Sequence, residues 1–231
     1  EITQIRKLSL WIFFIPLIGI NLCLIISQNP EFLENTFFSV DQLGRSAFSI
    51  PYFDGGLSIS RASRTFPQYL VFKPSMIFTA ILVYFYWKNN NNLINNLNST
   101  NINYKFKTFG ILSAIFLAIH AVFLGVKFDI QIYKLFRRVV LLLFIIFEIV
   151  AQGYLVFHFY KLKNKLEKLV VKKILLVKLI LVSTLAAVAI LSLPILISKG
   201  NTQFKHALEW NYFVGVILFY LLSRLFWKRT T

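Results

Sequence analysis

The chain alternates between apolar blocks of about 20 residues and shorter polar or basic segments. A block of that length crosses a hydrocarbon core of roughly 30 Å when it is helical. The pattern therefore predicts an all-α polytopic membrane protein, in which residues 1–231 form a single domain of six transmembrane helices. The predicted spans are residues 8–27, 69–87, 106–126, 139–160, 174–197 and 207–227.

The segments between the spans differ in character. Residues 28–68 form a long first loop, and residues 127–138 and 198–206 form short connections. Residues 88–107 are rich in asparagine and polar, which predicts a mobile connector. Residues 161–173 form a strongly basic connector, which is typical of a solvated face that attracts anionic lipid.

Composition agrees with a membrane protein, because 57% of the residues are hydrophobic, 15% are charged and the mean hydropathy is +0.67. The net charge of +16 does not indicate a nucleic-acid partner, because lysine and arginine flank apolar spans. Anionic lipid headgroups are the expected counter-charge.

The distribution of basic residues predicts an orientation, because basic loops stay in the cytoplasm. With a cytoplasmic N-terminus, 15 of the 25 basic residues fall on the cytoplasmic side, Lys178 among them, and four of the nine acidic residues fall in the first loop. Both termini are then cytoplasmic, and residues 28–68 are luminal or extracellular.

The first loop holds side chains that no bilayer helix needs, concentrated in residues 51–69. The guanidinium group of arginine donates two parallel hydrogen bonds to a phosphate, so Arg61 and Arg64 are candidates to bind a headgroup phosphate. Alternatively, they pair with Asp54. Ser58 and Ser60 are candidate polar contacts to the same lipid.

Several polar residues fall inside the predicted spans or at their outer ends. A charge at the bilayer centre costs about 2.5–3.5 kcal/mol, so such residues are rarely accidental. Glu148 falls near the middle of the fourth span and His120 in the outer half of the third, while His206, Glu209 and Trp210 lie at the outer mouth of the sixth. Two structural alternatives stay open: Glu148 as a neutral acid bonded to a neighbouring helix, and His120 as an interhelical histidine.

Signatures of soluble enzyme classes are missing from the sequence. It has no Gly-rich phosphate loop, no His-Glu-x-x-His pair and no Gly-x-Ser-x-Gly elbow. Its three histidines are scattered and Cys23 is its only cysteine, so we expect no metal site, no disulfide within the chain and no cofactor.

The architecture resembles the Frag/DRAM/Sfk membrane proteins, and most closely the Golgi branch that remodels the lipid of GPI anchors. The shared features are the first-loop residues Leu57-Ser58-Ile59-Ser60 and Phe66-Pro67-Gln68-Tyr69, the aromatic end of the second span, Tyr84-Phe85-Tyr86-Trp87, and Glu209 at the opening of the last span. The sequence departs from that pattern at Leu57, where the family has proline, and at Phe136-Arg137-Arg138, where the family often has histidine.

The resemblance implies lipid handling, with remodelling of acyl chains in the luminal or outer leaflet as the sharper expectation. It favours a Golgi or endoplasmic reticulum location, with plasma membrane or lysosome as alternatives. The hypothetical catalytic set is His120 as base, with Glu148 or Glu209 orienting it. The hypothetical substrate contacts are Ser58, Ser60, Arg61, Arg64, His206 and Trp210.

Other function classes compete with this hypothesis. A non-enzymatic lipid-binding or scaffolding protein would have the same pocket without turnover, and an accessory subunit would cover its apolar faces with a partner protein. A channel or transporter ranks lowest, because the spans lack a polar lining and two matching half-repeats.

Overall fold

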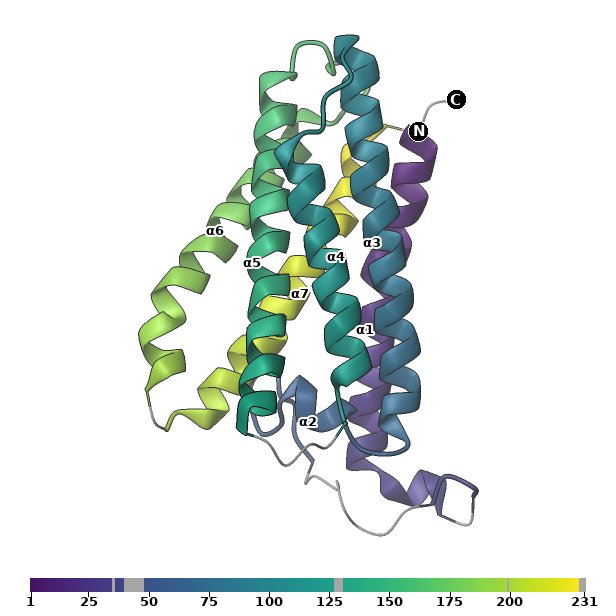
Figure 1. Ribbon diagram of the computed structural model, residues 1–231, viewed down its shortest axis with the longest axis vertical. Coiled ribbons are helices and arrows are strands. Elements are labelled where there is room, and N and C mark those ends of the chain that lie inside the picture. The colour runs from purple at the N-terminus through teal and green to yellow at the C-terminus, as the bar shows by residue number, and fades with distance from the viewer. Residues whose placement is uncertain (35, 40–47, 127–130, 199, 229–231) are drawn as a thin grey trace.

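A computed structural model of the protein describes residues 1–34, 36–39, 48–126, 131–198 and 200–228, and every long element within these residues is a helix. Six long helices run side by side along one axis (Figure 1). They are α1 (Ile2–Gln28), α3 (Gln68–Asn98), α4 (Lys105–Phe123), α5 (Gln131–Lys161), α6 (Lys172–Ile197) and α7 (Thr202–Phe226). Two short helices, η1 (Pro30–Leu33) and α2 (Ile59–Ser63), belong to the first loop.

Five of these helices are long and apolar enough to cross a membrane: α1, α3, α4, the part of α5 from residue 135 and α6 to residue 196. This agrees with a multi-pass membrane protein. The helix α7 has a similar length, 25 residues, but is less apolar because it carries Lys205, His206, Glu209 and Arg224. The sixth span therefore stays a prediction.

The long helices close into a ring around a packed core. In ring order, α1 packs against α3, α3 against α4, α4 against α5, α5 against α6, and α6 against α7, which returns to α1. The helices α1 and α3 approach closely at Gly19, where a Cβ atom would lie 2.4 Å from the Ser75 hydroxyl oxygen. Small residues at such contacts are typical of membrane helix pairs.

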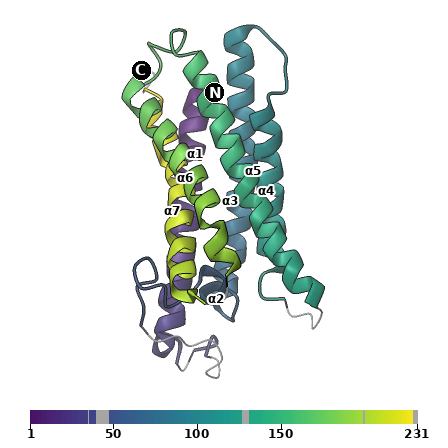
Figure 2. The same cartoon turned by 90° about the vertical axis from the view of Figure 1, so that its left-hand side faces the viewer.

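The two ends of the bundle carry different segments (Figures 1 and 2). The loop end holds residues 48–67, including α2, together with the start of α7. The basic end holds the N-terminus, the connector 162–171 and Lys228. The first loop thus lies at the opposite end of the bundle from the basic connector. Which side of a membrane each end faces stays a prediction.

The prediction of a mobile connector over residues 88–107 is wrong for its first half, because α3 continues to Asn98. The asparagines bury their amides by bonding to backbone: Asn90 donates to the Tyr86 carbonyl at 2.8 Å, and Asn95 accepts from the Ile102 N–H at 3.0 Å. Asn91 likewise accepts from the Tyr104 N–H at 3.0 Å. The bonds of Asn91 and Asn95 fold residues 99–104 back onto the end of α3.

Two other predicted connectors contain more structure than expected. The helix α5 begins at Gln131, inside the predicted turn 127–138, of which residues 127–130 lie outside the described residues. At the basic connector, Val170 pairs with Trp227 as an isolated antiparallel bridge, with bonds from the Val171 N–H to the Phe226 carbonyl and from the Lys228 N–H to the Leu169 carbonyl, both 2.9 Å.

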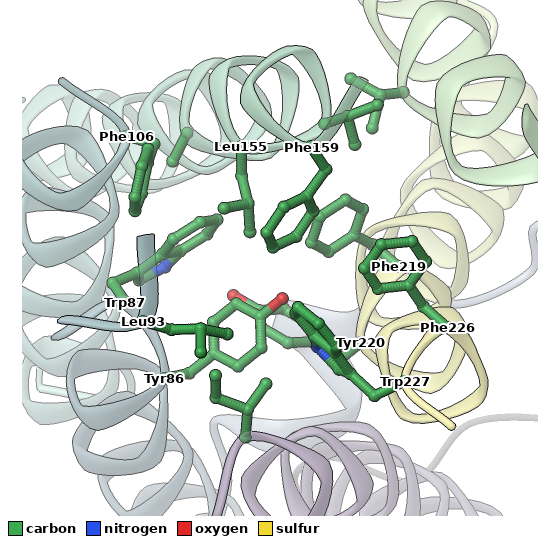
Figure 3. Packing of buried hydrophobic residues seen from close by; sticks show 14 of the residues in the cluster. Tyr86, Trp87, Leu93, Phe106, Leu155, Phe159, Phe219, Tyr220, Phe226 and Trp227 are labelled. Carbon is green, nitrogen blue, oxygen red and sulfur yellow. The ribbon is translucent and has the colours of Figure 1, made fainter. Parts of the chain in front are cut away.

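Aromatic side chains fill the half of the core nearer the basic end (Figure 3). Tyr86, Trp87 and Tyr220 meet edge to face, with ring centroids 4.9 Å apart for the two tyrosines. The chain accommodates Trp87 by placing Gly110 of α4 opposite it, since a Cβ there would lie 2.2 Å from the indole Cγ. A smaller apolar cluster fills the half nearer the loop end.

Candidate functional site

The short helix α2 lies at the loop end and, together with its N-cap and C-cap, carries four of the six predicted lipid contacts. Its N-cap is Ser58, whose hydroxyl accepts from the Arg61 N–H at 3.2 Å. Serine is a preferred N-cap because it satisfies a backbone donor that the helix leaves free. This gives the buried Ser58 side chain a structural role, whereas Ser60 is half-buried and offers its backbone N–H.

The start of α7 fastens this segment through side chains that bond to loop backbone. His206 Nδ1 lies 2.9 Å from the Gly55 carbonyl and Trp210 Nε1 donates to the Leu57 carbonyl at 2.8 Å. Asn211 adds a bond of 2.7 Å to the Tyr52 carbonyl. Because a carbonyl only accepts, His206 carries its proton on Nδ1 in this contact. His206 and Trp210, predicted as lipid contacts, are therefore used to hold the loop.

Glycine is required where the loop meets α7. Gly55 has φ +60°, and a Cβ atom there would lie 1.7 Å from the Gln203 carbonyl oxygen. Only glycine adopts this conformation readily and approaches backbone this closely. The Gly-Gly pair noted in the sequence thus serves the docking of the loop.

Glu209 faces the first turn of α2. Its carboxyl group lies against the backbone N–H groups of Ser60 and Ile59. The observed surroundings of Glu209 are thus the loop backbone, and no contact joins it to His120 or Glu148 within the described residues.

Arg61 and Arg64 project from this anchored segment with exposed side chains. The alternative partner, Asp54, is occupied elsewhere: its carboxylate accepts from the Ser49 hydroxyl at 2.6 Å and from the N–H groups of Ile50 and Gly56, both at 2.8 Å. These bonds, led by that from Ser49, lower the pKa of Asp54 below its ordinary value. Over the part of the chain that the structure describes, neither arginine forms an ion pair.

His120 lies near the end of α4, with its imidazole against the Phe72 ring at 6.4 Å between centroids. Its Nδ1 is buried with no hydrogen-bond partner among the described residues, and the charge of Arg137 acts on it. Ser113, which bonds to Glu148, is two turns away along the same helix, on the order of 10 Å. The predicted pairing of His120 with either glutamate is therefore not assembled.

Glu148 occupies the middle of the bundle as a fully bonded group. One carboxyl oxygen lies 2.6 Å from the Ser113 hydroxyl of α4, and the other accepts from Gln152 at 2.9 Å and from the Tyr220 hydroxyl of α7. Glu148 as a whole is 1% exposed. The indole Nε1 of Trp87, buried and without a hydrogen-bond partner within the described residues, lies beside Glu148 and Tyr220. This arrangement agrees with the interhelical role left open for Glu148.

A second part of this network was missed from the sequence. Lys178 of α6 is completely buried, donates to the Ser223 hydroxyl at 2.8 Å and lies over the Phe219 ring, 4.1 Å from its centroid. Ser223 also bonds to the Tyr86 hydroxyl at 2.9 Å. The rings of Tyr86 and Tyr220 pack edge to face in the core (Figure 3), so the bonded set of Tyr86, Ser223 and Lys178 packs against the bonded set around Glu148. A single lysine within the apolar run 174–182 was the available signal.

No group of three or more His, Cys, Asp or Glu side chains gathers to hold a metal ion within the described ranges. No protein-family model, curated protein or solved structure matches this chain. The predicted site residues thus divide into a loop-end group around α2, an isolated His120 and a separate core network at Glu148.

Proposed function

We propose that this membrane protein binds a phospholipid at its loop end, with Arg61 and Arg64 as ligands of the headgroup phosphate. One observation carries the proposal. The segment that bears both arginines is anchored to the bundle by several bonds, while both guanidinium groups are exposed and the nearby Asp54 is occupied by Ser49, Ile50 and Gly56.

The spacing of the two arginines suits a single anion. Arg61 belongs to α2 and Arg64 is its C-cap, still with right-handed helical backbone angles, so the two residues, three apart, lie on the same side. Each planar guanidinium donates two parallel bonds to phosphate oxygens. A helix as short as α2 is unstable alone, so its fixation by Trp210 and Glu209 gives the backbone that carries the arginines a defined position before a ligand binds. Preorganisation of this kind lowers the entropic cost of binding.

Apolar side chains of the same loop support a lipid rather than a free anion. Phe48 and Phe53 are 81% and 87% exposed at the loop end. Exposed aromatic rings beside basic groups are typical of surfaces that enter the headgroup layer of a bilayer. A phosphate at Arg61 and Arg64 would then carry its acyl chains toward these rings and the apolar helix faces.

We propose binding without turnover. Acyl remodelling, which the resemblance to the Frag/DRAM/Sfk proteins implies, needs a base beside its orienting carboxylate, whereas His120, Glu148 and Glu209 have separate surroundings. The family, the compartment and the catalytic set stay predictions.

The test is photo-crosslinking in detergent micelles with a phosphatidylinositol whose acyl chain carries a diazirine, followed by chymotryptic peptide mapping. We expect labelling of peptides within residues 48–72, and at least tenfold less labelling there after Arg61→Gln/Arg64→Gln. Arg138→Gln is the matched control, because Arg138 is an exposed arginine at the same end of the bundle. Glycerophosphoinositol serves as competitor to separate headgroup recognition from acyl-chain contact.

Equal labelling of residues 48–72 in the double variant and the wild type would refute the arginine site. Release of lysophospholipid or acyl exchange by the wild-type protein, lost in His120→Ala, would instead support the catalytic alternative and overturn binding without turnover.

A further inference from the structure

A groove opens between α5 and α6 at the basic end, far from the loop end. Its lining residues are Val156, Tyr160, Lys163, Asn164, Lys172, Leu175, Leu176 and Leu179. The polar members come from the last turn of α5, the connector and the first residue of α6. The apolar members lie further into the two helices, on α5 before Tyr160 and on α6 after Lys172. The groove is therefore polar at its mouth and apolar along its floor.

The level of the groove along the bundle matches a membrane interface. The candidate span of α5 ends at residue 161 and that of α6 begins at residue 172. The mouth therefore lies where apolar helices give way to a polar connector, and the floor lies within the first turns of the spans. Figure 1 shows that α6 leans away from α5 toward the loop end, so the apolar side of the groove continues along the helix faces that meet lipid.

The charge at the mouth is strongly positive. Lys163 and Lys172 are exposed and belong to a segment, 161–173, that contains six lysines and one glutamate. Lys163 lies over the Tyr160 ring, 4.8 Å from its centroid. Lys172 bonds to Glu167 at 2.5 Å, but both side chains are more than 60% exposed, and a pair so exposed contributes little. An incoming phosphate can therefore share or displace this contact.

Below the mouth the surface is aliphatic. Val156 and Leu175 are buried at the floor, while Leu176 and Leu179 are 58% and 41% exposed on the α6 wall. Basic pockets between transmembrane helices that lie above an apolar surface recognise anionic lipid headgroups.

We propose that this α5–α6 groove binds one anionic phospholipid, with the headgroup phosphate between Lys163 and Lys172 and an acyl chain against Leu176 and Leu179. Charge complementarity selects the occupant: the lysine mouth attracts the headgroup, and the aliphatic floor excludes a soluble anion from the rest of the groove. The site is independent of the arginines at the loop end.

The test uses phosphatidylglycerol with a diazirine on its acyl chain, the full-length protein in detergent, and chymotryptic mapping of labelled peptides within residues 154–180. Two surface lysines near an anionic lipid contribute enough attraction for roughly a thirtyfold change in binding. We therefore expect about that loss of labelling in Lys163→Gln/Lys172→Gln. Glu167→Gln, which frees Lys172 and removes a negative charge, should raise labelling about fivefold.

The matched control is Lys165→Gln/Lys168→Gln, which makes the same charge change on the same connector with lysines that do not line the groove. All four lysines are exposed, so the variants should fold alike. Equal losses in both double variants would overturn the site in favour of general surface attraction. Equal labelling by photoactivatable phosphatidylcholine, or full competition by soluble glycerol phosphate, would likewise overturn it. Labelling at residues 48–72 should not change in these variants.

Discussion

Replacement of Glu148 gives the sharpest test of how the bundle tolerates a carboxyl group at its centre. The Ser113 hydroxyl has one hydrogen but lies close to two acceptors, the Glu148 oxygen at 2.6 Å and the Gly110 carbonyl at 2.8 Å. If Ser113 donates to Gly110, Glu148 must supply the other hydrogen as a neutral acid. The second Glu148 oxygen then accepts from Gln152 and Tyr220, and every contact has one donor and one acceptor.

Glutamine can reproduce this pattern, because its N–H donates to Ser113 while its oxygen accepts from Gln152 and Tyr220. Leucine cannot. Three hydrogen bonds at about 0.6 kcal/mol each inside a membrane bundle give a loss of roughly 2 kcal/mol. The buried Tyr220 hydroxyl left without an acceptor adds about 1–3 kcal/mol. We therefore expect Glu148→Leu to destabilise by roughly 3–5 kcal/mol and Glu148→Gln by less than about 1 kcal/mol.

The assay is thermal unfolding of both variants in the same detergent, followed by tryptophan fluorescence, with Trp87 as a reporter beside the site. For a chain of this size, each kcal/mol shifts Tm by about 2–4 °C. Glu148→Gln should melt within a few degrees of the wild type, whereas Glu148→Leu should melt far lower. If Glu148→Gln were as damaging as Glu148→Leu, the neutral-acid arrangement would be refuted and a charged carboxylate would be required.

Three further outcomes follow from the packing and the loop. Gly110→Ala places a Cβ atom 2.2 Å from Trp87 and should cost about 1–3 kcal/mol in a melting experiment, whereas Gly153→Ala, with its nearest atom 3.7 Å away, should be neutral or stabilising. Asp54 has a lowered pKa in the folded loop, so its ionised carboxylate stabilises the loop above the unfolded pKa of about 4. That stabilisation is lost as the pH falls through the pKa of the folded state. The protection of the Gly56 amide from hydrogen exchange, relative to an unfolded chain at the same pH, should fall over that range, and Asp54→Asn should remove that pH dependence. Trp210→Phe keeps the ring contact with Tyr52 but loses the bond to Leu57, so exchange in α2 should accelerate by about tenfold, and unchanged protection would show that α7 does not anchor the loop.

The positions of the long helices were predictable because a helix that crosses the hydrocarbon core of a bilayer needs about 20 apolar residues. The blocks around residues 8–27 and 174–197 lie within α1 and α6, each continuous through an internal proline, Pro16 and Pro194. Helix ends were less predictable where polar residues continue a helix. Asn91 and Asn95 have the composition of a loop, yet each accepts from a backbone N–H of residues 102–104 that only the folded chain brings near.

The sequence allowed the polar residues of the candidate site to be picked out, but it did not predict which of them contact one another. Glu148 stands out in any apolar span, whereas its partners Ser113 and Tyr220 come from helices whose rotation the sequence does not specify. Lys178 entered the orientation argument as a surface charge, although it is completely buried. His206 and Trp210 lie at the loop end as predicted, but their donors meet loop carbonyls, which no spacing rule indicates.

An experimental structure of the protein in lipid nanodiscs that contain phosphatidylinositol tests the central proposal most directly. The arginine site predicts a lipid phosphate within hydrogen-bond distance of the Arg61 and Arg64 guanidinium groups, with Trp210 still bonded to the Leu57 carbonyl. Ordered phospholipid at other surfaces only, with both arginines turned to solvent or paired with protein carboxylates, would contradict it.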